Sequence, residues 1–200
     1  MKKKLLITIA CLSVILCTLV AGTIAWLIDD TPTITNTFTP SNIDVELSET
    51  KGGTNKEFKT VPGATIEKDP TITVAANSEA CWLFVKIEEK GGDVTVGEVT
   101  HNFDAFVTYE MAADTQGAKI WTPVNGTTGV YYRQVGASDT AQDFPVLNGN
   151  KVTVKSDVTK AMMDALYADT TKYPTLTFTA YAIQQEGFGT AELAWAEIPK

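Results

Sequence analysis

Apolar and polar positions alternate along much of the chain in short runs that are typical of β-strands. The clearest run is Ala80–Glu88 (ACWLFVKIE), in which Cys81 and every second residue after it are apolar. Trp82 and Phe84 are large and apolar on the opposite face. We therefore expect this strand to be covered on both faces and to lie in the centre of a sheet.

Weaker runs of the same kind predict further strands. The run Asn42–Leu47 (NIDVEL) places Ile43, Val45 and Leu47 on one face. A turn is expected at Val61-Pro62-Gly63, because proline fixes one backbone angle and glycine accepts a positive one. The other predicted strands are Thr71–Val74, Phe103–Glu110, Lys119–Trp121, Val130–Val135, Lys151–Val154 and Thr175–Ile183.

Two segments have the 3.6-residue period of an amphipathic helix. Val158–Ala168 follows Ser156 and Asp157, either of which is a candidate N-cap, and Ala191–Glu197 follows Thr190. Many short strands with one or two short helices predict an all-β fold, a jelly-roll-like β-sandwich.

The first 25 residues have a different composition. Three lysines at positions 2–4 precede an uncharged apolar stretch, Leu5–Ala25, that ends in small residues. This order is typical of a secretory signal peptide, and cleavage is expected between Ala25 and Trp26. The apolar stretch is also long enough to span a bilayer as a helix, so an uncleaved membrane anchor stays an alternative.

The pattern divides the chain into a signal helix at 1–25, a segment at 26–38 and a β-sandwich domain at 39–200. Cleavage would remove three lysines and no acid, which changes the formal net charge from −8 to −11. An acidic surface argues against nucleic acid as a partner. Cys11 and Cys17 lie in the signal, so Cys81 would be the one remaining cysteine and no disulfide within the chain is expected.

Residues that could carry catalysis are few and isolated. The single histidine, His101, could contribute to a metal site with Asp104, but protease zinc sites usually take two or more histidines at helical spacing. No G-x-S-x-G elbow, phosphate-binding loop or EF-hand loop is found. Cys81 falls in a predicted core strand, where an unreactive thiol is expected. We therefore expect no enzyme, no metal site and no cofactor.

Two weaker signals have both a structural and a functional interpretation. The tripeptide Asn125-Gly126-Thr127 matches a glycosylation sequon and also spells a turn. Trp121, Tyr131 and Tyr132 could form a sugar-binding platform, although packing in or between sheets is the expected role.

Four stretches span nearly the whole chain in a fixed order. They are GTIAW (22–26), NTFTPSNIDVEL (36–47), VPGATIEKDPTITVAANSEACWLFVKIE (61–88) and AIQQEGF (182–188), the last followed by AELAWAEI. Together they resemble the TasA and camelysin (CalY)-like proteins of Gram-positive bacteria. The second stretch departs from the family pattern at Ser41, where glycine is usual.

The resemblance implies a secreted jelly-roll subunit that assembles head-to-tail with itself into extracellular fibres of a biofilm matrix. It also implies export with a signal peptidase of the SipW type, and it leaves room for a companion matrix or anchoring protein. Some members are described as metalloendopeptidases, but no matching metal-binding motif occurs here. The alternative functions are a membrane-anchored surface or adhesion module and a camelysin-type secreted metalloendopeptidase.

Cleavage after Ala25 would give the chain a new N-terminal strand. At the strand period of two, Trp26, Ile28, Ile34 and Phe38 share one face of the segment 26–38. Such a segment suits addition to a free sheet edge of a neighbouring subunit, which is donor-strand exchange. The alternative is pairing within its own subunit as an edge strand. We predict that these four residues carry polymerisation.

Overall fold

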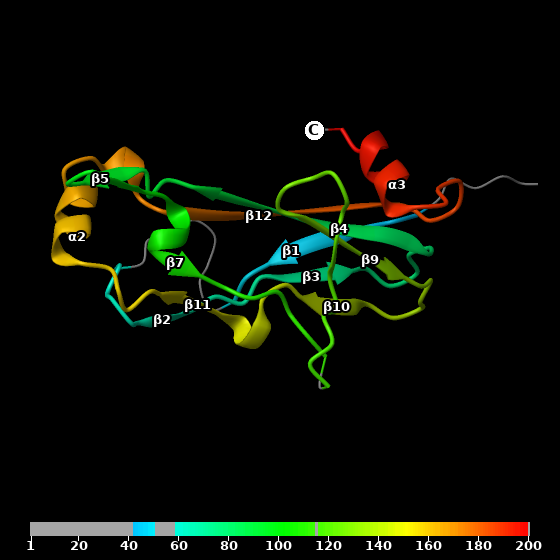
Figure 1. Cartoon of the computed structure of the whole chain (residues 1–200). Helices are drawn as coiled ribbons and strands as arrows, with labels where there is room; N and C mark the ends of the chain where they lie inside the picture. Colours follow the sequence, from blue (N-terminus) through cyan, green and yellow to red (C-terminus); the bar gives the residue numbers. More distant parts are fainter. Residues whose placement is uncertain (1–41, 51–58, 115, 200) are drawn as a thin grey trace, which may run out of the picture. The chain divides into compact units, whose positions relative to one another are not determined.

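A computed structural model describes residues 42–50, 59–114 and 116–199 of the protein (Figure 1). They belong to one compact unit, Pro40–Lys200. The described strands are β1 (Val45–Ser48), β2 (Thr65–Glu67), β3 (Thr71–Val74), β4 (Cys81–Lys90), β5 (Val94–Val96), β6 (Val99–His101), β7 (Val107–Thr108), β8 (Thr122–Pro123), β9 (Val130–Val135), β10 (Gln142–Pro145), β11 (Lys151–Val154) and β12 (Thr175–Gln184). The described helices are α2 (Lys160–Tyr167) and α3 (Ala191–Glu197), with 3-10 turns η1 (Phe103–Ala105), η2 (Asn148–Asn150) and η3 (Thr170–Lys172).

One layer is an antiparallel sheet in the strand order β12-β4-β9-β8. Inside it, β4 pairs along its full length with β12 and over Cys81–Lys86 with β9. The first five residues of β4 are all buried, because neighbouring elements cover both of its faces. The prediction of a central strand covered on both faces is therefore confirmed.

The second layer consists of two three-stranded sheets, β1-β3-β10 and β2-β11-β7. The segment that contains β2 and β3 runs antiparallel to the segment that contains β10 and β11. In this pair, β3 lies beside β10 in one sheet and β2 lies beside β11 in the other. Backbone hydrogen bonds continue the pairing between them, from Lys68 N to Asn150 O at 2.9 Å and from Val146 N to Pro70 O at 2.9 Å. A separate hairpin is formed by β5 and β6.

The main core lies between the two layers. Its buried residues come from both, among them Ile72, Val74, Cys81, Leu83, Val85, Ile87, Trp121, Phe144, Val146 and Val152. The predicted apolar faces of the first and last long strands also pack against it, namely Ile43, Val45, Leu47, Leu176, Phe178, Ala180 and Ala182. The arrangement is a β-sandwich, as predicted, and its jelly-roll connectivity stays a prediction.

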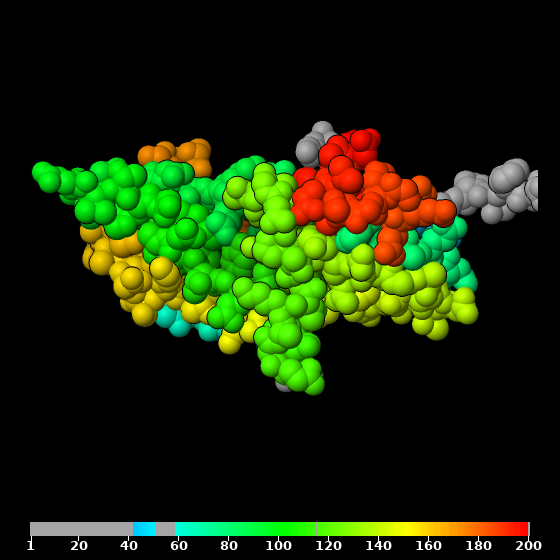
Figure 2. Space-filling view, turned by 45° about the vertical axis from the view of Figure 1, so that its right-hand side comes forward, coloured from blue at the N-terminus to red at the C-terminus, as the bar shows by residue number. Residues whose placement is uncertain are grey.

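A second cluster forms where α3 covers the outer face of the first layer (Figures 1 and 2). Thr190 caps this helix as predicted, with its Oγ1 accepting a hydrogen bond from Leu193 N at 3.4 Å. Trp195 is 6% exposed and lies with its ring centroid 5.3 Å from that of Phe84 and 5.4 Å from that of Tyr181. These rings attach α3 to β4 and β12.

The third cluster lies under α2 and contains Val94, Phe106, Val154, Val158, Met162 and Leu166. The helix is capped by Thr159, whose Oγ1 accepts from Met162 N at 3.3 Å, so the predicted caps Ser156 and Asp157 are wrong. The physical reason is that Val158 is itself buried in the cluster, which places the first helical turn beyond it. The predicted helix itself is confirmed, in a shorter form.

The predicted strand at Phe103–Glu110 is only partly correct. Its first part is η1, in which Phe106 N donates to Phe103 O at 2.9 Å. Both phenylalanines are buried, and their spacing of three residues suits a tight turn better than an extended strand. Extended pairing is then limited to β7.

The predicted strand at Lys119–Trp121 is wrong. The segment makes only a single bridge to the preceding loop, between Ala113 and Lys119, and Ile120 N donates to Ala112 O at 3.2 Å. Regular pairing begins at the next residue, in β8. The sequence pattern also missed four strands of three or four residues, β2, β5, β6 and β10.

The ring contacts of α3 give a direct stability prediction. Trp195→Ala should lower the free energy of unfolding by about 3–5 kcal/mol, as expected for removing a buried aromatic side chain. The control is Leu193→Ala in the same helix, because Leu193 is 59% exposed and its loss should change stability little. Denaturant unfolding followed by tryptophan fluorescence and circular dichroism measures both. Equal effects of the two substitutions would contradict this packing.

Candidate assembly edge

The residues predicted to carry cleavage and polymerisation are Ala25, Trp26, Ile28, Ile34 and Phe38, and all five lie outside the described residues. The structure does describe the surface to which an added strand would have to pair. A strand can add only where a sheet edge presents unpaired backbone N–H and C=O groups.

The longest such edge in the described part of the chain belongs to β12. This ten-residue strand pairs with β4 on one side, and no described strand pairs with its other side. Just beyond the ladder, Gln185 N donates to Ala80 O at 2.9 Å, which fixes the alternation of hydrogen bonds. The backbone groups of odd-numbered residues of β12 therefore face β4, and those of even-numbered residues face the free edge.

The side chains of the even-numbered residues point into the sandwich. Leu176, Phe178, Ala180 and Ala182 pack against the main core but are only partly buried, whereas Leu83 and the other core residues at the start of β4 are buried. The core is therefore less completely covered along this edge than in the centre of the sheet. An added strand would complete both the backbone pairing and the apolar cover.

The other face of the sheet along this edge is polar and solvent-exposed towards its Thr175 end. Lys86 and Glu88 both belong to β4, the strand next to β12, and Lys86 Nζ lies 3.1 Å from Glu88 Oε1. A hydrogen bond from Lys86, together with its positive charge, lowers the pKa of Glu88 below its usual range. Both side chains are about one-third exposed, so this pair contributes little to stability.

A partly buried ion pair holds the chain that leaves β1 near β12. Lys68 Nζ lies 3.0 Å from Glu49 Oε2, with these side chains 16% and 11% exposed, and 5.4 Å from the centre of the Phe178 ring. Thr50 N donates to Asp69 Oδ1 at 3.1 Å in the same region. This arrangement fixes the end of β1 beside the core-facing side of β12.

The weak catalytic candidates are not brought into a metal site. His101 is the last residue of β6, and Asp104 lies in η1. An open polar hollow includes Asp104 with Glu89 and Asp93. In the described part of the chain, no group of three or more histidine, cysteine, aspartate or glutamate side chains is placed to hold a metal ion.

Cys81 is fully buried at the start of β4. Burial raises the pKa of its thiol to about 11, because the charged thiolate would lose its hydration. The predicted position of Cys81 in a core strand is confirmed.

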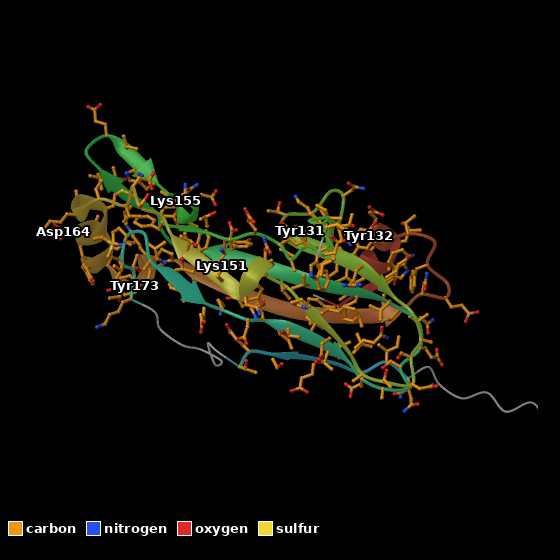
Figure 3. All side chains as sticks on the ribbon, turned by 90° about the horizontal axis from the view of Figure 1, so that it is seen from below. Tyr131, Tyr132, Lys151, Lys155, Asp164 and Tyr173 are labelled. Carbon is orange, nitrogen blue, oxygen red and sulfur yellow. The ribbon has the colours of Figure 1, made fainter. Side chains whose placement is uncertain are left out.

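The suggested sugar platform is wrong. Trp121 is 1% exposed and donates from Nε1 to Pro145 O at 2.9 Å, and Tyr131 packs against the same core. Tyr132, the next residue of β9 (Figure 3), lies on the opposite face with its ring 5.6 Å from Trp82. Neighbouring residues of a strand point to opposite faces, so the three rings cannot share one surface.

The tripeptide beginning at Asn125 forms the predicted turn. Gly126 has a φ of 75°, and Thr127 Oγ1 donates to Val124 O at 2.8 Å. Asn125 Nδ2 donates to Glu192 Oε1 at 2.9 Å, which ties the turn to α3.

No family model, curated protein or solved structure matches the chain. No helix in the described residues is long and apolar enough to cross a membrane.

The free edge of β12 was not identified from the sequence, although the strand itself was. A weak signal is present: Thr175, Thr177 and Thr179 alternate with apolar residues, which is typical of a strand with one open face. That signal describes the face of a strand and contains nothing about which strands lie beside it.

The buried thiol predicts a pH-dependent difference in stability. The folded pKa of Cys81, about 11, lies above the ordinary value of about 8.5, so the folded state favours the neutral thiol. Its contribution to stability is complete below the ordinary pKa and is lost as the pH rises through the folded pKa. The free energy of unfolding of Trp26–Lys200 should therefore fall more steeply between pH 8.5 and 11 than that of the same form with Cys81→Ala. The free energies of unfolding are measured by denaturant titration at each pH. If those of the two forms fall in parallel as the pH rises, this prediction is contradicted.

Proposed function

We propose that this protein is a secreted structural subunit that assembles head-to-tail into extracellular fibres of a biofilm matrix. In this proposal a SipW-type signal peptidase releases the chain at Ala25–Trp26, and the segment 26–38 becomes a donor strand. The protein then acts in the extracellular matrix or at the cell surface, by itself or with a companion matrix or anchoring protein.

The free edge of β12 is the observation that carries the proposal. It offers outward backbone groups at alternate residues and partly buried apolar side chains between them. Exposed edges of this length are usually blocked by charges, proline or short strands, since they invite pairing with other chains. The core-facing positions of β12 carry no charge and no proline from Leu176 to Ala182.

The segment 26–38 has the matching chemistry on the donor side. Its apolar residues Trp26, Ile28, Ile34 and Phe38 recur at the strand period. Burying four such side chains would contribute roughly 6–10 kcal/mol before the cost of ordering the segment. The donor and acceptor surfaces differ, so the contact is heterologous and continues from subunit to subunit as a filament.

Removal of the donor segment tests this assignment. The form Trp26–Lys200 should produce fibres in negative-stain electron microscopy, and the form Thr39–Lys200 should stay monomeric. Ile34→Asp with Phe38→Asp should act like the deletion, because charged side chains cannot enter the apolar core edge. Folding is checked by circular dichroism and thermal melting.

Two results would contradict this mechanism. Fibres from Thr39–Lys200 would show that the segment is not the donor. Unfolding of the double aspartate variant would show that the segment pairs within its own subunit.

A proline substitution tests β12 as the acceptor. Ala180→Pro removes an outward-facing N–H and leaves the hydrogen bonds to β4 intact, so the subunit should fold. Strand addition would lose a hydrogen bond and meet the proline ring, which should raise the critical concentration for fibres about tenfold or more, equivalent to ~1.4 kcal/mol.

The matched control is Thr179→Pro, one residue earlier. Its N–H faces β4, so this variant should lose stability in the monomer, as measured by thermal melting. Unchanged fibre formation by folded Ala180→Pro would exclude this edge of β12 as the acceptor.

A further inference from the structure

A hollow lies where β8 ends beside β9 in the first layer. It has a volume of about 430 Å³ and is lined by Trp82, Ile120, Thr122, Tyr132, Arg133 and Gln134. β8 pairs with β9 only at Tyr131 and Tyr132, so it does not continue the sheet beyond them. The volume lies within the range of small-ligand sites, which is roughly 300–1,000 Å³.

The strand register places four of the lining side chains on one face of the sheet. Trp82 pairs with Gln134, Phe84 pairs with Tyr132, and Tyr132 pairs in turn with Thr122. Paired residues project to the same face, and so do residues two apart in one strand. This is the outer face, on which α3 packs. Only Tyr132 is shared with the platform of three rings excluded above.

Arg133 belongs to the opposite face. Its guanidinium carbon lies 4.1 Å from the centre of the Phe144 ring, which is part of the main core. We therefore assign it no contact with a ligand in the hollow. Among the described residues, no lysine and no acidic residue lines the hollow. A ligand there meets no charged side chain from the outer face.

The Tyr132 ring is held in place by two other rings. Its centroid lies 5.6 Å from that of Trp82 and 6.4 Å from that of Phe84. Trp82 is 5% exposed, and its Nε1 donates to Phe188 O at 3.3 Å, which fixes the supporting ring. A side chain that is already ordered loses little entropy when a ligand binds.

The hydrogen-bonding side chains of the hollow are uncharged. Thr122 and Tyr132 carry hydroxyl groups that both donate and accept, and the Gln134 amide offers two donors and an acceptor. In the described part of the chain, none of these three side chains is hydrogen-bonded to another residue. Mixed donors and acceptors of this kind match ligand hydroxyl groups, which also donate and accept.

We propose that this hollow binds a neutral glycan, with one sugar ring against Tyr132 and its hydroxyl groups on Thr122, Tyr132 and Gln134. The C–H groups of a sugar carry a slight positive charge and pack favourably on the negative face of an aromatic ring. The carboxylate of an acidic sugar would lose hydration and gain no cation on this face. The site is separate from the outer edge of β12, which lies on the other side of the sheet.

The test is isothermal titration calorimetry of the full-length protein in a detergent without a sugar head group. The probes are neutral hexamers of glucose, mannose and galactose, each compared with the hexamer of the corresponding uronic acid. At least one neutral probe should bind with a dissociation constant in the millimolar range or below. Its affinity should be at least tenfold higher than that of its acidic match.

Two substitutions locate the binding in the hollow. Gln134→Ala and Tyr132→Phe should each weaken it about fivefold, as expected for the loss of one neutral hydrogen bond. Tyr132→Phe keeps the ring and its packing on Trp82. The matched controls are Gln184→Ala, at the exposed end of β12, and Tyr131→Phe, on the opposite face of β9. Both controls should bind like the unchanged protein, and thermal melting reports on the folding of every variant.

Three outcomes would overturn the proposal. The first is the absence of binding by every neutral probe at millimolar concentration. The second is equal affinity for a neutral probe and its uronic acid match. The third is unchanged binding by folded Gln134→Ala and Tyr132→Phe, which would place the glycan elsewhere on the chain. Gln134 is exposed, so its substitution keeps the test decisive if Tyr132→Phe is unstable.

Discussion

The pairing of β4 with two neighbours is the constraint on which the rest of the structure depends. This strand is buried on both faces, so each of its polar backbone groups must find a partner inside the sheet. β12 and β9 supply those partners. The main core then forms on one face of β4, and α3 covers the other through Trp195.

The same arrangement leaves the sheet with different boundaries on its two sides. At one side, β12 is as long as β4, and no described strand pairs with its outer edge. At the other, β8 covers only two residues of β9, and the sheet stops beside Arg133. The core-facing residues of the β12 side, Leu176, Phe178, Ala180 and Ala182, are apolar and partly buried.

The sequence correctly predicted most of the elements whose pattern is strongly periodic. Its predictions failed where tertiary contacts decide the local conformation. β3, β9, β11 and α3 have their predicted bounds, because alternation or helical spacing was unambiguous there. η1 replaced a predicted strand because Phe103 and Phe106 both reach the core. The cap of α2 moved to Thr159 because Val158 is buried in the third cluster. None of these contacts is visible in a local pattern.

The sequence by itself determined the β-rich class, the buried central strand and the apolar faces, because side-chain periodicity follows directly from backbone geometry. It also supplied the candidate residues of the segment 26–38, which lie outside the described structure. Only the tertiary structure decided that β12 ends its sheet among the described strands and that the Arg133 guanidinium lies beside the Phe144 and Trp121 rings. The reason is physical: strand order and side-chain partners depend on contacts between residues far apart in the chain, and a local pattern contains no information about them.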